Sequence, residues 1–192
     1  TSTTLTPSAA TGSGVTLTAS ATTGINGGQG FLTTDVGRLI RIREGSAWGY
    51  VLITGHTSTT VVTVTVLNTL TNANAKATWR LGLWSDTTGF PSCGTFYDDR
   101  LFLAGAATAP QRLDGSKTGL YTDFSPSATD GTVAADNAVA FTLNADDVNA
   151  IKWLVSAEKG LLAGTSRGEW QMRPSTQNEA ITPTNITGKP AT

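Results

Sequence analysis

Cysteine and histidine are almost absent from this 192-residue chain, which contains one of each, Cys93 and His56. A single cysteine excludes a disulfide within the chain and any zinc site built on several thiolates. A single histidine removes most zinc-hydrolase and Ser-His-Asp schemes that one chain could supply by itself. Cys93 has no basic neighbour in the sequence that would lower its pKa, so we do not expect a reactive thiol there.

Charged residues are also scarce, at 14% of the chain, against about 25% in a typical globular protein. The formal net charge is −1, whereas an autonomous DNA-binding module is expected to show a basic face or stripe. This argues against sequence-specific recognition of nucleic acid, although a near-neutral wall would let DNA slide past with few phosphate contacts. Arg41 and Arg43 share one face of a predicted strand and Arg38 lies opposite. Arg41 and Arg43 are therefore the candidate contacts with DNA or with a neighbouring subunit.

The chain has no apolar run long enough to cross a membrane as a helix and no signal peptide, so we expect no membrane anchor. It starts at Thr1 rather than at Met, and it ends at Thr192 without a clear structural terminus. We therefore interpret the chain as a piece of a longer protein.

Thr, Ser, Ala and Gly fill the positions that Lys and Glu usually occupy, and β-branched Thr suits the half-buried surface of a strand. With 39% hydrophobic residues, five Trp and six Phe, the chain is too apolar for a disordered tract. We expect an all-β protein in which residues 1–84 form a small β-sandwich or barrel domain. Its expected strands cover residues 14–20, 36–43, 48–54, 60–66 and 76–82.

A polar, turn-rich segment at residues 85–91 marks the expected boundary, and residues 85–192 form a second region. Short strands separated by turns with Gly, Asp and Ser are typical of β-propeller blades. We therefore expect propeller-like β structure that this chain does not complete. The expected strands cover residues 95–97, 100–104, 118–121, 138–143, 151–155, 160–163 and 169–172.

Paired carboxylates are the residues that most resemble catalytic or cation-binding groups. Asp98 and Asp99 precede Arg100, and a second pair is Asp146–Asp147. A site for a hard cation usually needs an Asp-x-Asp-x-Asp-Gly loop, which is missing here. Asp is favoured in turns by hydrogen bonds to its own backbone, so we interpret both pairs as turns. We expect no catalytic residue, no metal ligand, no cofactor and no enzymatic activity.

Seven short motifs follow one another in a fixed order along most of the chain, from about Phe31 to Ile186. They are Asp35–Arg41 (DVGRLIR), Leu81–Pro91 (LGLWSDTTGFP), Phe96–Gly105 (FYDDRLFLAG), Pro110–Gln111, Ser116–Phe124 (SKTGLYTDF), Val148–Val155 (VNAIKWLV) and Leu161–Trp170 (LLAGTSRGEW). No single motif is specific, but the ordered series resembles a family of bacteriophage tail proteins. That family includes tail tubular protein B, also called the tail nozzle, and packaged-DNA stabilisation proteins.

The resemblance implies a homo-oligomeric ring, expected to be hexameric, at the distal end of a short tail in the virion. Such a ring forms a channel for DNA and holds the packaged genome until infection. The implied partners are other tail proteins, namely the adaptor and the fibres or spikes, together with DNA that passes through. Several family members carry a domain like the first catalytic-cysteine half-domain of ubiquitin-activating enzymes. That description would fall on residues before Trp84 and denotes a small β fold, not an activity.

An alternative from a different class is a carbohydrate-binding module of a tail-associated host-recognition protein. One or more of the five Trp residues would then stack on a sugar, although four of them lie at or beside apolar strand residues and most are expected in the core. A glycan hydrolase would need two carboxylates facing each other across a cleft. No such pair stands out in the sequence.

Overall fold

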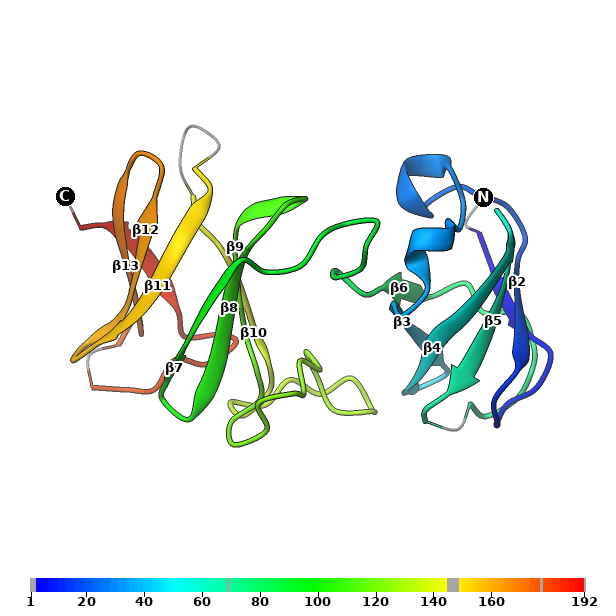
Figure 1. Cartoon of the computed structure of the whole chain (residues 1–192). Coiled ribbons are helices and arrows are strands. Elements are labelled where there is room, and N and C mark those ends of the chain that lie inside the picture. Colours follow the sequence, from blue (N-terminus) through cyan, green and yellow to red (C-terminus); the bar gives the residue numbers. More distant parts are fainter. Residues whose placement is uncertain (1–2, 69, 145–148, 177, 192) are drawn as a thin grey trace. The chain divides into compact units, whose positions relative to one another are not determined.

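The computed structural model describes residues 3–68, 70–144, 149–176 and 178–191, and the chain forms two compact units. The first comprises Thr1–Thr88 with Thr129–Gly131, and the second comprises Gly89–Ala128 with Thr132–Thr192. Both units consist of antiparallel β-sheets (Figure 1), and the described ranges contain no α-helix. The same ranges hold no helix with the length and apolarity needed to span a membrane. The chain is all-β, as its composition predicted.

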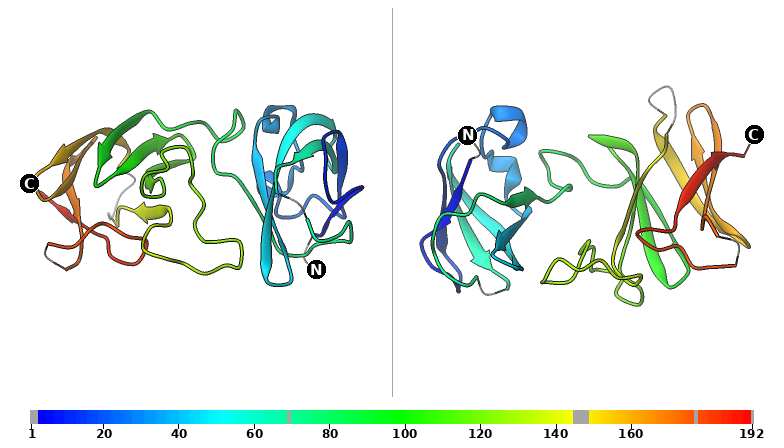
Figure 2. Two further views of the ribbon diagram at one scale, coloured as in Figure 1. Left: turned by 90° about the horizontal axis from the view of Figure 1, so that it is seen from below. Right: turned by 180° about the vertical axis from the view of Figure 1, so that it is seen from behind.

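The first unit is one six-stranded antiparallel sheet that curls into a half-barrel (Figure 2). Its strand order is β1-β2-β5-β4-β3-β6. The strands are β1 (Leu5–Pro7), β2 (Val15–Ala19), β3 (Leu39–Glu44), β4 (Ala47–Ser58), β5 (Val61–Val66) and β6 (Trp79–Leu81). Two short 3-10 helices, η1 (Asn26–Gly28) and η2 (Thr33–Asp35), lie between β2 and β3. The curl brings the two edges of the sheet together, because Leu5 and Lys76 exchange backbone hydrogen bonds of 2.9 and 2.8 Å.

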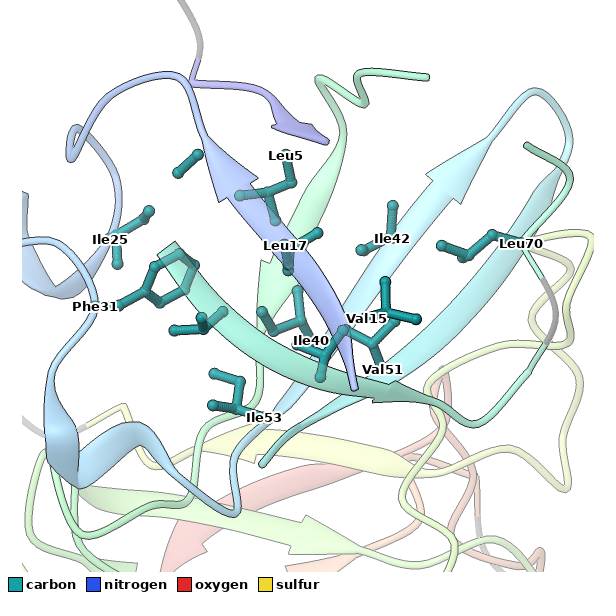
Figure 3. Packing of buried hydrophobic residues seen from close by; sticks show 13 residues of the cluster. Leu5, Val15, Leu17, Ile25, Phe31, Ile40, Ile42, Val51, Ile53 and Leu70 are labelled. Atoms are coloured by element: carbon teal, nitrogen blue, oxygen red, sulfur yellow. The ribbon is translucent and has the colours of Figure 1, made fainter. Parts of the chain in front are cut away.

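Alternation of apolar and polar residues gives each strand of this sheet one buried side. In β2, Val15 and Leu17 are buried while Thr16 and Thr18 are exposed. Burying one Val, Leu, Ile or Phe side chain contributes about 1.5–3 kcal/mol, so the buried cluster on the concave side stabilises the curl. Figure 3 shows this cluster, which comprises Leu5, Val15, Leu17, Ala19, Ile25, Phe31, Ile40, Ile42, Val51, Ile53, Val62, Val64 and Leu70.

The second unit contains two four-stranded antiparallel meanders in which consecutive strands are neighbours. The first meander consists of β7 (Cys93–Tyr97), β8 (Arg100–Ala106), β9 (Ala109–Gly115) and β10 (Val139–Thr142). The second consists of β11 (Ile151–Ala157), β12 (Gly160–Thr165), β13 (Gly168–Arg173) and β14 (Thr187–Pro190). Apolar side chains of both meanders, such as Phe102 and Met172, belong to one core.

The two meanders pack against each other. The first strand of the second meander, β11, contacts β7, β8 and β9 of the first. The fourth strands also meet, because the ring of Phe141 on β10 packs against Gly188 on β14, where a Cβ atom would lie 2.8 Å from Phe141 Cε1. Four-stranded sheets that follow one another and share a core are typical of propeller blades. The second region therefore has the expected propeller-like form.

The turn predicted between the third and fourth expected strands of the first region, at residues 55–58, is wrong. β4 continues to Ser58 through irregularities at Ile53/Gly55 and His56/Ser58, and the turn follows at residues 59–60. β-Bulges of this kind insert an extra residue without ending the strand. Gly55 and His56 therefore lie within the ladder instead of in a loop.

The strand predicted at residues 118–121 is also wrong. Lys117 and Leu120 form an isolated bridge around a tight turn, and Gly119 within it has a φ of 70°. Conversely, β1, β9 and β14 were not predicted. β9 contains Pro, Asp and Gly, which are depleted in strands, and its pairing with β8 and β10 imposes the extended conformation.

The β7–β8 hairpin confirms the turn predicted at Asp98 and Asp99. Their φ angles of 51° and 54° lie in the left-handed region, as in the two-residue turns that join twisted antiparallel strands. Asp98 accepts a hydrogen bond of 3.0 Å from the backbone N–H of Ile181, and Asp99 accepts one of 2.7 Å from the Tyr121 hydroxyl. The two carboxylates therefore anchor loops of the second unit.

A buried arginine anchors a second loop of this unit. Arg100 on β8 is 2% exposed. Its guanidinium donates hydrogen bonds of 2.6 Å to Ser116 O, 2.7 Å to Asn137 O and 2.5 Å to Ala135 O. Burial lowers the pKa of Arg100, and the nearby negative charges of Asp98 and Asp136 oppose that shift. Carbonyl dipoles of the 116–137 segment therefore solvate this buried charge.

We predict that Arg100→Met destabilises the protein by about 3 kcal/mol, because several buried carbonyl groups lose their donor at about 1–3 kcal/mol each. Urea unfolding followed by tryptophan fluorescence measures the loss, and limited proteolysis should cut the 116–137 segment sooner. Lys152→Met is the control, since Lys152 is exposed on β11 and should change stability by no more than about 0.5 kcal/mol. Equal unfolding midpoints for both variants would contradict this role of Arg100.

Candidate functional site

Arg41 and Arg43 lie on the outward side of β3, since Ile42 between them is fully buried in the core. The strand alternation predicted this shared side. The β3–β4 register places Arg41 opposite Tyr50 and Arg43 opposite Trp48. Each candidate arginine therefore has an aromatic residue as its direct neighbour across the ladder.

The two aromatic rings hold the guanidinium groups by cation–π contacts. Arg41 Cζ lies 4.1 Å from the centroid of the Trp48 ring and 5.6 Å from that of Tyr50. Arg43 Cζ lies 5.7 Å from the Trp48 centroid. Such contacts contribute about 0.5–1 kcal/mol at exposed sites. They restrain the positions of the guanidinium groups.

A third arginine joins this face from the other neighbour of β3. Arg80 on β6 lies directly opposite Arg41 in the β3–β6 ladder. Its side chain is exposed, and Nη1 donates a hydrogen bond of 2.8 Å to the backbone oxygen of Trp79. Sequence reasoning missed Arg80 because only the pairing of β6 with β3 brings it close. We name the group of Arg41, Arg43, Arg80, Trp48 and Tyr50 the basic-aromatic face.

The arginines of the basic-aromatic face carry like charges that repel one another. Burial has the largest effect and lowers the pKa of Arg41. The electrostatic interaction with Tyr50 raises this pKa, and the positive charge of Arg43 lowers it. Like charges placed directly opposite each other destabilise an antiparallel pair, and Arg41 and Arg80 occupy such positions.

Arg38 does not belong to the basic-aromatic face, as the alternation predicted. It is buried and donates hydrogen bonds of 2.9 Å to Asp35, 2.8 Å to the Asn26 side chain and 2.6 Å to Gly82 O. Asp35 also accepts a 2.8 Å hydrogen bond from the Thr87 hydroxyl. This network ties the η1–η2 connection to the chain after β6, so it has a structural role.

The charged residues of the first unit fall into two groups, those in buried ion pairs and those outside them. Residues 1–88 contain three acidic residues, and two of them form buried ion pairs, Asp35 with Arg38 and Glu44 with Lys76. The remaining basic residues of this stretch are Arg41, Arg43 and Arg80. Residues 129–131, which include Asp130, belong to the same unit, and Thr129 O accepts a hydrogen bond of 2.6 Å from Trp48 N–H. A carboxylate-bearing segment therefore lies beside the basic-aromatic face.

Among the described residues, the other polar candidates do not gather into a second candidate site. The part of the chain that the structure describes has no group of three or more His, Cys, Asp or Glu residues suited to a metal ion. Cys93 is half-buried on β7, and burial raises the pKa of its thiol. His56 Nε2 lies 3.0 Å from the backbone oxygen of Phe31. Asp130 lies in a turn and Gly131 in the bend that follows it, and Asp146–Asp147 lie outside the described residues.

The aromatic residues differ in part from expectation, because fewer Trp side chains belong to the core than predicted. Trp170 is buried, whereas Trp48 is half-buried on the outward side of β4. Trp153 is 40% exposed and lies directly on Gly164, where a Cβ atom would be 1.8 Å from the indole. The second unit therefore presents one large indole outside its core.

Neither models of known protein families nor curated proteins match this chain. The resemblance to phage tail proteins therefore rests on the ordered motifs alone and stays a hypothesis. The basic-aromatic face, by contrast, follows from the register of β3 with β4 and β6.

We predict that Asp35→Asn costs about 3 kcal/mol near pH 7, where the buried Arg38 would lose its charged partner. Burial alone would raise the pKa of Asp35, but hydrogen bonds from Leu32 N–H, Thr87, Arg38 and Asn26 outweigh it and lower the pKa below its usual 3.8. Ionised Asp35 therefore stabilises the fold above pH 3.8, and this contribution is lost as the pH falls through the folded-state pKa.

Urea unfolding at a series of pH values measures this effect. The stability difference between Asp35→Asn and the wild type should shrink as the pH falls below the usual carboxyl range. Asp86→Asn is the matched control, because it removes the same charge from an exposed position of the same unit. A deficit that stays constant down to acid unfolding would mean that ionisation of Asp35 does not stabilise the fold.

Proposed function

We propose that this chain belongs to a structural virion protein of a phage tail, of the nozzle or tail-tube type. The protein assembles into a ring, expected to be hexameric, that closes or channels packaged DNA. The observation that carries the proposal is the basic-aromatic face, where Arg41, Arg43 and Arg80 lie on one side of the sheet. Few phosphate contacts mean weak retention of DNA, which suits a surface past which DNA slides.

The ordered motifs support the same proposal independently, and they extend it to the partners. Tail adaptor proteins and fibres or spikes are the proposed neighbours, and the virion tail is the proposed location. Ring assembly requires a head-to-tail contact that closes by rotation. The protein then acts through its shape and surface charge, without turnover of a substrate.

Electron-microscope imaging of the purified protein tests this proposal, with the mass in solution measured alongside. We expect a closed ring with a central channel, either alone or after addition of the tail adaptor protein. The mass should correspond to the number of subunits seen in the ring. A protein that stays monomeric under both conditions would overturn the proposal.

A carbohydrate-binding module is the second candidate function, and the position of Trp153 favours it. Sugar rings stack on exposed aromatic faces, and Trp153 presents an indole that is 40% exposed on β11. Val155, two residues further along the same strand, is 45% exposed and extends the apolar surface. This surface belongs to the second unit and is separate in sequence from the basic-aromatic face.

If this second function is correct, Trp153→Ala should abolish glycan binding, because stacking on the indole supplies the apolar contact. Titration with fragments of host surface polysaccharide, followed by quenching of tryptophan fluorescence, measures the binding. Phe96→Ala is the control, since Phe96 is an exposed aromatic residue of the same unit at 59% exposure. Binding that survives in Trp153→Ala, or no binding by the wild type, would exclude this role of Trp153.

A further inference from the structure

We propose that the unpaired edge of β6 binds an extended peptide segment of a partner protein, in which an acidic residue lies between two apolar residues. The site is a pocket of about 350 Å³ in the first unit, between β6 and residues Thr3, Thr23 and Gly24. The inference goes beyond the proposed function, because it names a docking site and the chemistry of its ligand and does not require a ring.

The two edges of the half-barrel separate beside this pocket. Leu5 and Lys76 exchange backbone hydrogen bonds, but the next contact across the seam comes from a side chain, because the Trp79 indole N–H donates a 2.8 Å hydrogen bond to Thr3 O. The Thr3 hydroxyl in turn donates one of 2.7 Å to Thr23 O. Within the described ranges, β6 therefore pairs with β3 on one side and with no strand on the other.

The free edge of β6 presents two backbone donors to the pocket. Thr78 O and Gly82 N–H form hydrogen bonds of 2.9 and 2.7 Å with β3. Since bonded and non-bonded positions alternate along antiparallel strands, Arg80 also faces β3, and Trp79 and Leu81 turn their N–H groups away from it. Neither N–H has an acceptor among the described residues. Such an edge is a template for one more strand, which an extended peptide can supply.

The register determines which side chains such a peptide would meet. Trp79 and Leu81 lie opposite the buried residues Ile42 and Ile40, so their side chains are on the core side, where they give the pocket an apolar wall. Arg80 between them points to the other side of the strand. A strand added at this edge would therefore place one residue beside Arg80 and its two neighbours beside Trp79 and Leu81.

Charge complementarity selects an acidic residue for the central position. Arg80 is exposed, and its side chain is the only charged one among the described residues that line the pocket. It forms no ion pair with a described residue. Opposite charges placed directly across a ladder attract, and apolar pairs stabilise a sheet in the same way. The segment that fits is therefore apolar, acidic, apolar.

A blocked, fluorescently labelled peptide of nine residues tests the inference. It alternates Thr and Val and has Asp at its centre, between two Val residues, and the control peptide has Lys in place of Asp. Fluorescence anisotropy during titration with the 192-residue chain measures both affinities. The Asp peptide should bind about 2- to 30-fold more tightly, because attraction by Arg80 is replaced by repulsion in the control.

Hydrogen exchange of single amides, followed by NMR, locates the bound peptide. With the Asp peptide at about ten times its Kd, exchange of the Trp79 and Leu81 amides should slow about 10-fold, since only the unbound protein exchanges. The amide of Arg80 faces β3 and should already be protected in the free protein. This pattern distinguishes strand addition at β6 from binding elsewhere.

The variant Arg80→Glu should reverse the preference, so that the Lys peptide binds more tightly than the Asp peptide. Lys152→Glu is the matched control, because it makes the same change in charge at an exposed position of the second unit, and it should keep the preference for Asp. If Arg80→Glu fails to fold, the two peptides and the amide exchange of the wild type still decide the question.

The inference is overturned if the wild type does not bind the Asp peptide at about 1 mM, or if both peptides bind equally. Slowed exchange at another strand in place of Trp79 and Leu81 would also overturn it, as would an Arg80→Glu variant that still prefers Asp. A ring that forms without peptide binding would contradict this inference alone. Peptide binding by a persistent monomer would support it and contradict the proposed ring.

Discussion

Two buried ion pairs determine which charged side chains of the first unit remain on its surface. Asp35 with Arg38 and Glu44 with Lys76 pair opposite charges on side chains that are at most 7% exposed. Burying such pairs is favourable only when further hydrogen bonds satisfy the remaining polar atoms, and Asp35 has donors from several neighbouring segments. With these two acids paired, the carboxylates of residues 1–88 other than Asp86 are each bound to a basic side chain.

Lys76 connects this charge distribution to the closure of the half-barrel. Its side chain neutralises Glu44, while its backbone exchanges hydrogen bonds with Leu5 at the opposite edge of the sheet. The closure fixes the segment that enters β6, and β6 in turn places Arg80 beside Arg41. Because strand faces alternate, a slip of one residue in the β3–β6 register would turn Arg80 inward and expose Trp79. The basic-aromatic face therefore depends on the same contacts that hold the curl.

The sequence predicted the structure correctly where the alternation within a single strand contains all the information needed. Alternation in β2 and β5 predicted strands with one buried side, and the same rule placed Arg41 and Arg43 together on β3. It failed where pairing overrides local preference, as in β9, whose polar residues are held extended by β8 and β10. It also failed for Arg80, since no local pattern reveals that β6 lies beside β3. Cross-strand neighbours are a property of topology, and topology supplied both Arg80 and the partners of Arg38.

A small number of arginines is consistent with a surface past which DNA moves. Proteins that form 6–10 phosphate contacts bind DNA strongly and lose about 10³–10⁵ in affinity as salt rises to physiological levels. Fewer contacts retain a duplex less strongly, because each contact adds its own increment of counterion release. Under the proposed function, a wall with few basic residues would therefore let DNA translate past it at little cost, which is the property that a channel requires.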